Sequence, residues 1–185
     1  KALEINKQFY GEVHENTATV VNNLGILYDK LGRDQKAGDY YEEAMKIRNR
    51  LYENDHHSKV ISLLNLAVFN TSQKKFENAA EYFQKALEMS QRLYKGDHPV
   101  IAMIYDGRAQ LYQKTGDSVR AEELFMESLK MKQRLYEPPH TSIAMTMNNL
   151  GFLYHKTGRI NKADSLFTRS LEMLKALYPP SHPTL

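Results

Sequence analysis

Histidine is the residue type in this 185-residue sequence whose spacing comes closest to a chemical site. Imidazole nitrogens are common zinc ligands, and a zinc ion holds them at about 2.0–2.1 Å. The one local cluster is Asp55-His56-His57, and three adjacent residues cannot fill a metal site alone. Whether other histidines share a metal depends on the elements that carry them. Five of the seven histidines recur every 42 residues: His14, His56, His98, His140 and His182.

Motifs for catalysis do not accompany these histidines. The sequence has no Cys, which excludes disulfides, thiolate metal ligands and a cysteine nucleophile. It has no phosphate-binding Gly-rich loop, no His-Glu-x-x-His motif and no nucleophile elbow. Adjacent carboxylates at Glu42-Glu43 and Glu122-Glu123 are typical of solvated helix faces. The sequence therefore predicts no enzyme activity, no cofactor and no metal site.

Composition narrows the class of protein further. The 25 basic and 22 acidic residues give a net charge of +3, and acidic residues interrupt any basic stripe. Direct nucleic-acid binding is therefore not expected. No run of 18 apolar residues is present and no signal peptide opens the chain, so membrane insertion is not expected. Together with the lack of cysteine, this favours a cytoplasmic protein.

The 42-residue interval organises much more than the histidines. A tyrosine stands four residues before each of these five histidines, and sets of alanines and glycines also recur at this interval, each at its own position in the repeat. Lys74 is the exception among the glycines. So many coincidences at one period predict a four-repeat array. The recurring sets are Tyr10, Tyr52, Tyr94, Tyr136 and Tyr178; Ala37, Ala79, Ala121 and Ala163; and Gly32, Gly116 and Gly158.

Each repeat has the apolar spacing of two amphipathic helices. The first helix ends at the recurring glycine, and the second runs from about Asp34 to Tyr52 in the first repeat. The fold class expected is all-α, a right-handed superhelical solenoid of antiparallel helix pairs. Equivalent residues in successive pairs would lie roughly 20 Å apart, because packed helices are about 8–10 Å apart. The histidines therefore cannot share a metal, and a role at helix starts or in linker packing is expected.

The period also sets the expected organisation of the chain. Both ends fall inside the pattern, which predicts a single array cut from a longer protein. The expected segments are 1–13, the end of a preceding second helix; 14–55, 56–97, 98–139 and 140–181, repeats one to four; and 182–185, the start of a further repeat.

These helix pairs resemble the tetratricopeptide repeat, whose usual period is about 34 residues. The longer period here, with a Leu-Tyr-x-x-x-His-Pro link, is similar to the repeats of kinesin light chains and nephrocystin-like proteins. The resemblance covers essentially the whole chain. The matching motifs are Asn22-Asn23-Leu24-Gly25, Asn65-Leu66-Ala67, Asn148-Asn149-Leu150-Gly151 and Leu93-Tyr94 with His98-Pro99.

Two repeats depart from this pattern. Repeat three has Asp106-Gly107-Arg108 where repeats one and four carry Asn, Asn and Leu. Repeat two has Leu64, Asn70 and Lys74 at positions of Asn, Tyr and Gly. The repeats are therefore not expected to bind a partner identically.

Stacked helix pairs of this kind place their first helices along a concave groove. Counting from Leu24 and its equivalents, three positions per repeat are expected to face that groove. Apolar members would form pockets for anchor side chains, and amides would bond a peptide backbone. The expected groove residues are Thr19, Asn22, Ile26, Ile61, Leu64, Val68, Met103, Asp106, Gln110, Met145, Asn148 and Phe152.

Further polar residues extend this surface. His155 is expected to be a contact residue in the groove of the fourth repeat. Lys30, Lys114 and Lys156 near the ends of first helices predict a basic groove edge that favours an acidic peptide. Cations are also simply favourable at helix C-termini, and that alternative stays open.

The resemblance to kinesin light chains implies an extended internal cargo or adaptor peptide, with Asn22, Asn23, Asn65, Asn148 and Asn149 near its backbone. A carboxylate clamp is not expected, because no cation occupies the corresponding groove positions. The function predicted is thus a protein–protein interaction scaffold or adaptor. The alternatives are a self-associating structural array and a regulatory repeat domain of a larger enzyme or NTPase.

Overall fold

The computed structural model describes residues 2–178, and every regular element in that range is an α-helix. The predicted all-α repeat fold is confirmed. Two compact units, Lys1–Leu93 and Tyr94–Leu185, divide the chain and are described separately. Unit 1 contains α1 (Ala2–Tyr10), α2 (Glu15–Lys30), α3 (Asp34–Leu51), α4 (His57–Ser72) and α5 (Phe76–Leu93). Unit 2 contains α6 (Pro99–Thr115), α7 (Ser118–Leu135), α8 (Thr141–Lys156) and α9 (Ile160–Leu177).

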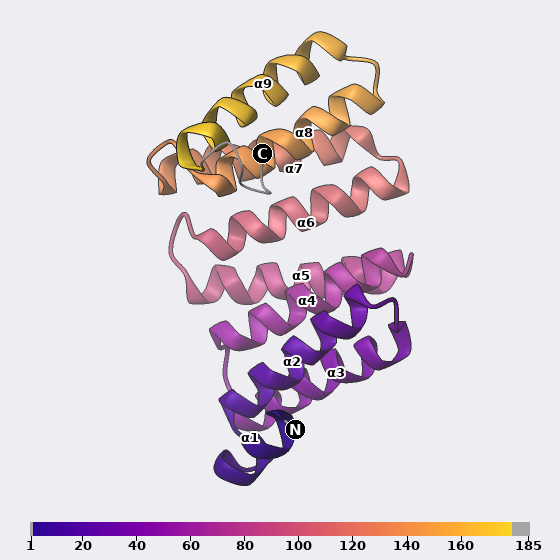
Figure 1. The fold of residues 1–185 in the computed structure, drawn as a ribbon, viewed down its shortest axis with the longest axis vertical. Helices are drawn as coiled ribbons and strands as arrows, with labels where there is room; N and C mark the ends of the chain where they lie inside the picture. Colours follow the sequence, from indigo (N-terminus) through magenta and orange to yellow (C-terminus); the bar gives the residue numbers. More distant parts are fainter. Residues whose placement is uncertain (1, 179–185) are drawn as a thin grey trace. The chain divides into compact units, whose positions relative to one another are not determined.

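The helices pack as antiparallel pairs, as Figure 1 shows. The first helices α2, α4, α6 and α8 pack against the second helices α3, α5, α7 and α9, respectively. Within unit 1, α3 also contacts α4, and within unit 2, α7 also contacts α8. Each of these two second helices therefore contributes side chains to the pair that follows it. No helix within residues 2–178 is both long and apolar enough to cross a bilayer.

Left-handed residues end the first helices. Gly32, Gly116 and Gly158 have φ values of 66°, 90° and 76° at or just after the helix ends. Glycine adopts this conformation without the steric cost that a Cβ imposes. Lys74 occupies the same place after α4 with φ 59°, so a lysine carries the strain there.

Small residues let the helices of a pair approach closely. The recurring alanines, Ala37, Ala79, Ala121 and Ala163, are all buried. Gly151 of α8 faces the ring of Phe167, and a Cβ at Gly151 would lie 2.8 Å from that ring. Ser128 of α7 donates a buried hydrogen bond to the carbonyl of Ala102 in α6 at 2.9 Å.

Candidate protein-interaction surface

The recurring histidines fix the start of each first helix. His14, His56, His98 and His140 are N-caps, and Nδ1 of each accepts a hydrogen bond at 3.1–3.2 Å from the backbone N–H two residues later. Each imidazole also stacks on the tyrosine four residues before it, with ring centroids 3.5–4.8 Å apart. The predicted helix-start role is confirmed for these four, and His182 lies outside the described residues.

Unit 1 joins its two first helices by an amide pair. Asn65 of α4 donates a hydrogen bond from Nδ2 to Oδ1 of Asn22 in α2 at 2.8 Å. Asn22 and Leu64 are buried, so their side chains lie beneath the surface of unit 1 and are not exposed to a partner. Among the other expected groove residues of unit 1, Ile26 and Ile61 are half-buried, and Thr19, Asn23 and Val68 are exposed.

Unit 2 exposes three large apolar side chains of the expected groove set on its first helices. Met103 of α6 is 47% exposed, and Met145 and Phe152 of α8 are 59% and 56% exposed. Side chains seven residues apart lie on the same side of a helix, so Met145 and Phe152 share a face. Gln110 and Asn148 are exposed there too, whereas Asn149 is half-buried. We call the exposed set Met103, Gln110, Met145, Asn148 and Phe152 the unit 2 face.

The side chain of Phe152 is exposed, but a neighbouring ring restrains it. Its ring makes an edge-to-face contact with the ring of Phe167 in α9, with centroids 5.1 Å apart at 71°. An aromatic ring held in place by a neighbour loses little freedom when a ligand covers it. Phe152 therefore has the properties of a rigid anchor for a partner side chain.

A buried charge lies under the unit 2 face. Lys132 of α7 is 4% exposed and pairs with the carboxylate of Asp106 in α6. Lys132 also donates to Oγ1 of Thr146 in α8 at 2.7 Å, and that hydroxyl donates to Asp106 at 3.1 Å. One network thus binds α6, α7 and α8. Asp106, an expected groove residue, is half-buried and already engaged by this network.

Unit 1 has a related network around Arg48 of α3. The Arg48 guanidinium donates to Glu15 of α2 and to Ser62 of α4, each at 2.8 Å. Burial raises the pKa of the Glu15 carboxyl, but the hydrogen bond and charge of Arg48, together with hydrogen bonds from Ser58 and Tyr52, outweigh this and hold that pKa below its ordinary value.

Neither Arg48 nor Lys132 was identified as a site residue from the sequence. The available signal was a charge at a buried position where the other repeats carry Ser90 and Leu174. The helical period predicts which face of a helix carries a residue, but it does not predict which side chain of another helix that residue contacts.

The expected basic residues lie at helix ends. Lys30, Lys114 and Lys156 are exposed in or next to the last turns of α2, α6 and α8, and His155 is exposed beside Lys156. In these places a cation also complements the helix dipole. Within residues 2–178, no three His, Asp or Glu side chains gather closely enough to hold a metal ion.

Comparison with known proteins places this geometry in a family. The tetratricopeptide repeat model matches residues 1–50, 59–134 and 101–176. No curated protein matches the chain in sequence. Among solved structures, BtubC (BKLC) from P. vanneervenii is similar at 29% identity with a TM-score of 0.76, over 98% of this chain and 72% of that one.

Two further structures share the fold at lower identity. A putative kinesin light chain with nearly identical TPR-like repeats, from Podosopora anserina, has 18% identity and a TM-score of 0.70, over 92% of this chain and 81% of that one. A Rap protein complexed with Competence and Sporulation Factor has 20% identity and a TM-score of 0.80, over 93% of this chain and 46% of that one. The family model covers most of the chain, and the paired helices with their Ala and Gly positions agree with it, so this chain belongs to the tetratricopeptide repeat family.

Proposed function

We propose that this array is a protein-interaction adaptor and that the unit 2 face holds an extended peptide or a short helix of a protein partner. The observation that carries the proposal is the exposure of Met103, Met145 and Phe152, at 47–59%, on the first helices of one unit. Large apolar side chains that are exposed together on one surface are typical of interaction sites. Methionine has a flexible side chain that adapts to the shape of a partner, and phenylalanine offers a large apolar ring. Both therefore suit contacts with the anchor side chains of a partner.

Polar groups on the same face suit a peptide backbone. Asn148 lies between Met145 and Phe152 along α8, and Gln110 is exposed on α6. A primary amide both donates and accepts, so each can bond a peptide N–H or C=O. The combination of apolar anchors with amides between them is the reason to favour a peptide over a small molecule.

The network below the face supports this function by keeping its helices in place. The Asp106–Thr146 bond joins α6 to α8, and Met145 directly precedes Thr146. A surface that is already ordered loses little conformational entropy on binding. The exposed cations Lys114 and Lys156 at the helix ends favour a partner segment that carries acidic residues.

Relatives of the same fold are consistent with partner binding. Tetratricopeptide-repeat proteins are typically non-catalytic scaffolds, and one neighbour of this fold was solved in complex with Competence and Sporulation Factor. A cargo or adaptor role of the kinesin-light-chain kind is the finer form of the proposal. In unit 1, the exposed Asn23 and Val68 would make a second, less apolar contact of the same kind.

The test is selection of peptides on the intact chain from a random display library, followed by affinity measurement on variants. Phe152→Ala is expected to weaken a selected peptide by roughly 30-fold or more, since a buried aromatic anchor contributes about 2 kcal/mol or more. Asn148→Ala is expected to weaken it by about 2- to 10-fold, the value of one hydrogen bond.

Matched controls lie on the next helix. Ile160→Ala removes an equally exposed apolar side chain from α9, and Asn161→Ala removes an exposed amide. Neither should change affinity. Equal affinities for Phe152→Ala and wild type would refute the groove assignment. Sedimentation of the free chain separates the alternative of self-association, for which mass would rise with concentration.

A further inference from the structure

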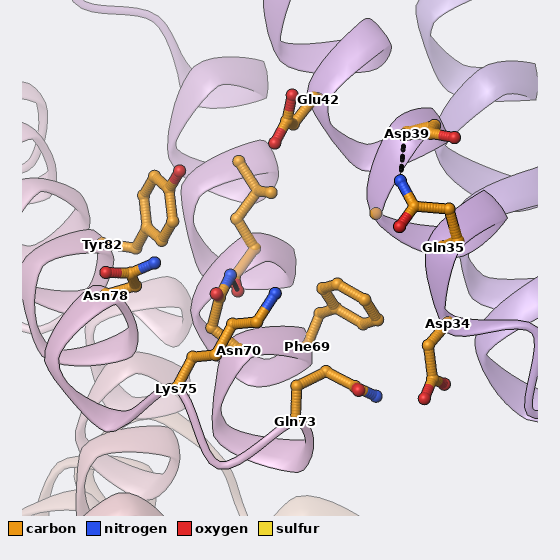
Figure 2. Close-up of a pocket in the computed structure, with 12 residues that line it drawn as sticks. Asp34, Gln35, Asp39, Glu42, Phe69, Asn70, Gln73, Lys75, Asn78 and Tyr82 are labelled. Carbon is orange, nitrogen blue, oxygen red and sulfur yellow. Dashed lines mark hydrogen bonds between the residues drawn. The ribbon is translucent and has the colours of Figure 1, made fainter.

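A pocket of about 360 Å³ opens in unit 1 between α3, the end of α4 and the start of α5. Its floor is apolar, because Leu66 and Phe69 of α4 are buried there. Tyr82 of α5 forms one wall, as Figure 2 shows. None of its lining residues belongs to the groove set. A volume near the lower end of the usual range for ligand pockets, about 300–1,000 Å³, suits one side chain or a small molecule.

The corresponding place in unit 2 is filled by the chain itself. Two repeats along, Gly38, Asn70 and Lys75 are replaced by Glu122, Tyr154 and Arg159. The Tyr154 hydroxyl donates to Glu122 at 2.8 Å, and the Arg159 guanidinium donates to the same carboxylate at 2.6 Å. The Arg159 guanidinium also lies 4.2 Å from the centroid of the Tyr154 ring. A phenol ring, a cation and a carboxylate therefore complete this site in unit 2.

Unit 1 keeps the cation of this trio and loses the ring and the carboxylate. Asn70 turns its amide back to its own helix, donating to the carbonyl of Leu66 at 2.8 Å. Gly38 has no side chain, and a Cβ there would lie 3.3 Å from Phe69. Lys75 stands where unit 2 has Arg159, and its ammonium group points over the pocket in Figure 2.

We propose that this pocket binds the side chain of a tyrosine from a partner protein. The guest ring takes the place that the Tyr154 ring fills in unit 2, on the Phe69 floor and next to the Lys75 cation. Its hydroxyl donates to a carboxylate of α3, in the role that Glu122 has in unit 2. Asp39 and Glu42 line that side of the pocket and are exposed.

Charge selects between tyrosine and its competitors. Three carboxylates line the α3 side, since Asp34 joins Asp39 and Glu42, so a phosphotyrosine would meet like charge. An arginine side chain would be attracted by these acids but would meet the Lys75 ammonium that points over the pocket. A neutral phenol avoids both repulsions and can accept a cation over its ring.

The experiment is an NMR titration of the isotopically labelled chain with N-acetyl-tyrosinamide. A single side chain is expected to bind with a dissociation constant on the order of millimolar. Saturable shifts should appear at the backbone amides of Phe69, Asn70 and Asn78. The phenylalanine analogue should bind more weakly because it lacks the hydroxyl, and the phosphotyrosine analogue should not bind.

Two variants make the test specific. Asn70→Tyr places in the pocket the ring that unit 2 carries, and it should abolish the shifts. Asn49→Tyr makes the same exchange at an exposed position of α3 outside the pocket and should leave them unchanged. If Asn70→Tyr fails to fold, the double variant Glu122→Gly with Tyr154→Asn supplies the converse test, because it should create a second tyrosine site in unit 2.

The outcomes are separable from those of the proposed function. Phe152→Ala should leave the titration unchanged, because Phe152 lies in the other unit. Absence of shifts with N-acetyl-tyrosinamide in the wild type overturns the inference. Persistence of the same shifts in folded Asn70→Tyr, or tighter binding of N-acetyl-argininamide, overturns it as well.

Discussion

Replacing Lys132 by serine tests whether the buried network positions α6, α7 and α8. The change removes a cation that is 4% exposed and leaves the Asp106 carboxylate, whose side chain is 15% exposed, with the hydroxyl of Thr146 alone. Removing one partner of a buried ion pair costs about 3–5 kcal/mol, because the other charge stays desolvated. The partial exposure of Asp106 puts the expected loss near 3 kcal/mol, the lower end of that range.

Another repeat of the chain supplies the compensating change. At the positions of Asp106 and Lys132, repeat two carries Leu64 and Ser90. The double variant Asp106→Leu with Lys132→Ser removes both charges, and a buried ion pair replaced by apolar packing is often neutral in stability. We therefore expect the double variant to recover most of the stability that the single variant loses.

The assay is thermal and urea unfolding of the intact chain, with hydrogen exchange of the α6 and α8 amides to locate the effect. A loss of 3 kcal/mol corresponds to a fall in melting temperature of roughly 6–12 °C for a chain of this size. The control is Lys130→Ser, which breaks an exposed pair with Glu127 on the same helix and should change stability by less than about 1 kcal/mol. A single variant as stable as this control, or a double variant no better than the single one, would refute the reasoning.

Three further perturbations have expected outcomes. His140→Ala should cost about 0.5–2 kcal/mol in urea unfolding because it removes an N-cap, whereas His140→Asn, which retains a capping acceptor, should cost less. Lys74→Gly should raise stability by about 1 kcal/mol because φ is 59° there, and Lys75→Gly, next to it without positive φ, should lower it. Burial raises the pKa of the Glu122 carboxyl, but hydrogen bonds from Arg159 and Tyr154 outweigh it and hold that pKa below its ordinary value of 4.5. The stability from this group is therefore present above pH 4.5 and lost as the pH falls below it, so Glu122→Gln should show a smaller acid-induced loss than wild type in melting scans.

The fold was predictable because the 42-residue period repeats each determinant along the chain. A single alanine or glycine says little, but recurring sets of each predict where helices pack closely and where they end. The second helix expected from Asp34 to Tyr52 is α3, Asp34–Leu51, with Tyr52 as its C-cap. The helical period gave the bounds of this helix almost to the residue, because it is a local property of the chain.

The surface was less predictable because it depends on which helix lies opposite. Asn22 and Asn148 occupy the same position in their repeats. Asn22 is nevertheless buried and accepts a hydrogen bond from Asn65, whereas Asn148 is exposed. The position of Asp106 in its repeat also predicted a side chain that faces the groove, but Lys132 from another helix forms an ion pair with its carboxylate. Such pairings are made between helices, so periodicity along one helix does not contain them. The repeat boundaries and the binding role of the groove residues stay predictions.

The departures from the repeat pattern are where the units differ physically. A residue that obeys the period performs the same packing task in every repeat, as the buried alanines do. A residue type that departs from the period is not needed for the packing that the repeats share. Asp106 introduces a buried ion pair under the unit 2 face, and Asn70 leaves a pocket that Tyr154 fills in the other unit. In a repeat array, therefore, the exceptions to the period are the first places to search for partner-specific contacts, and the regular positions are the first to search for stability.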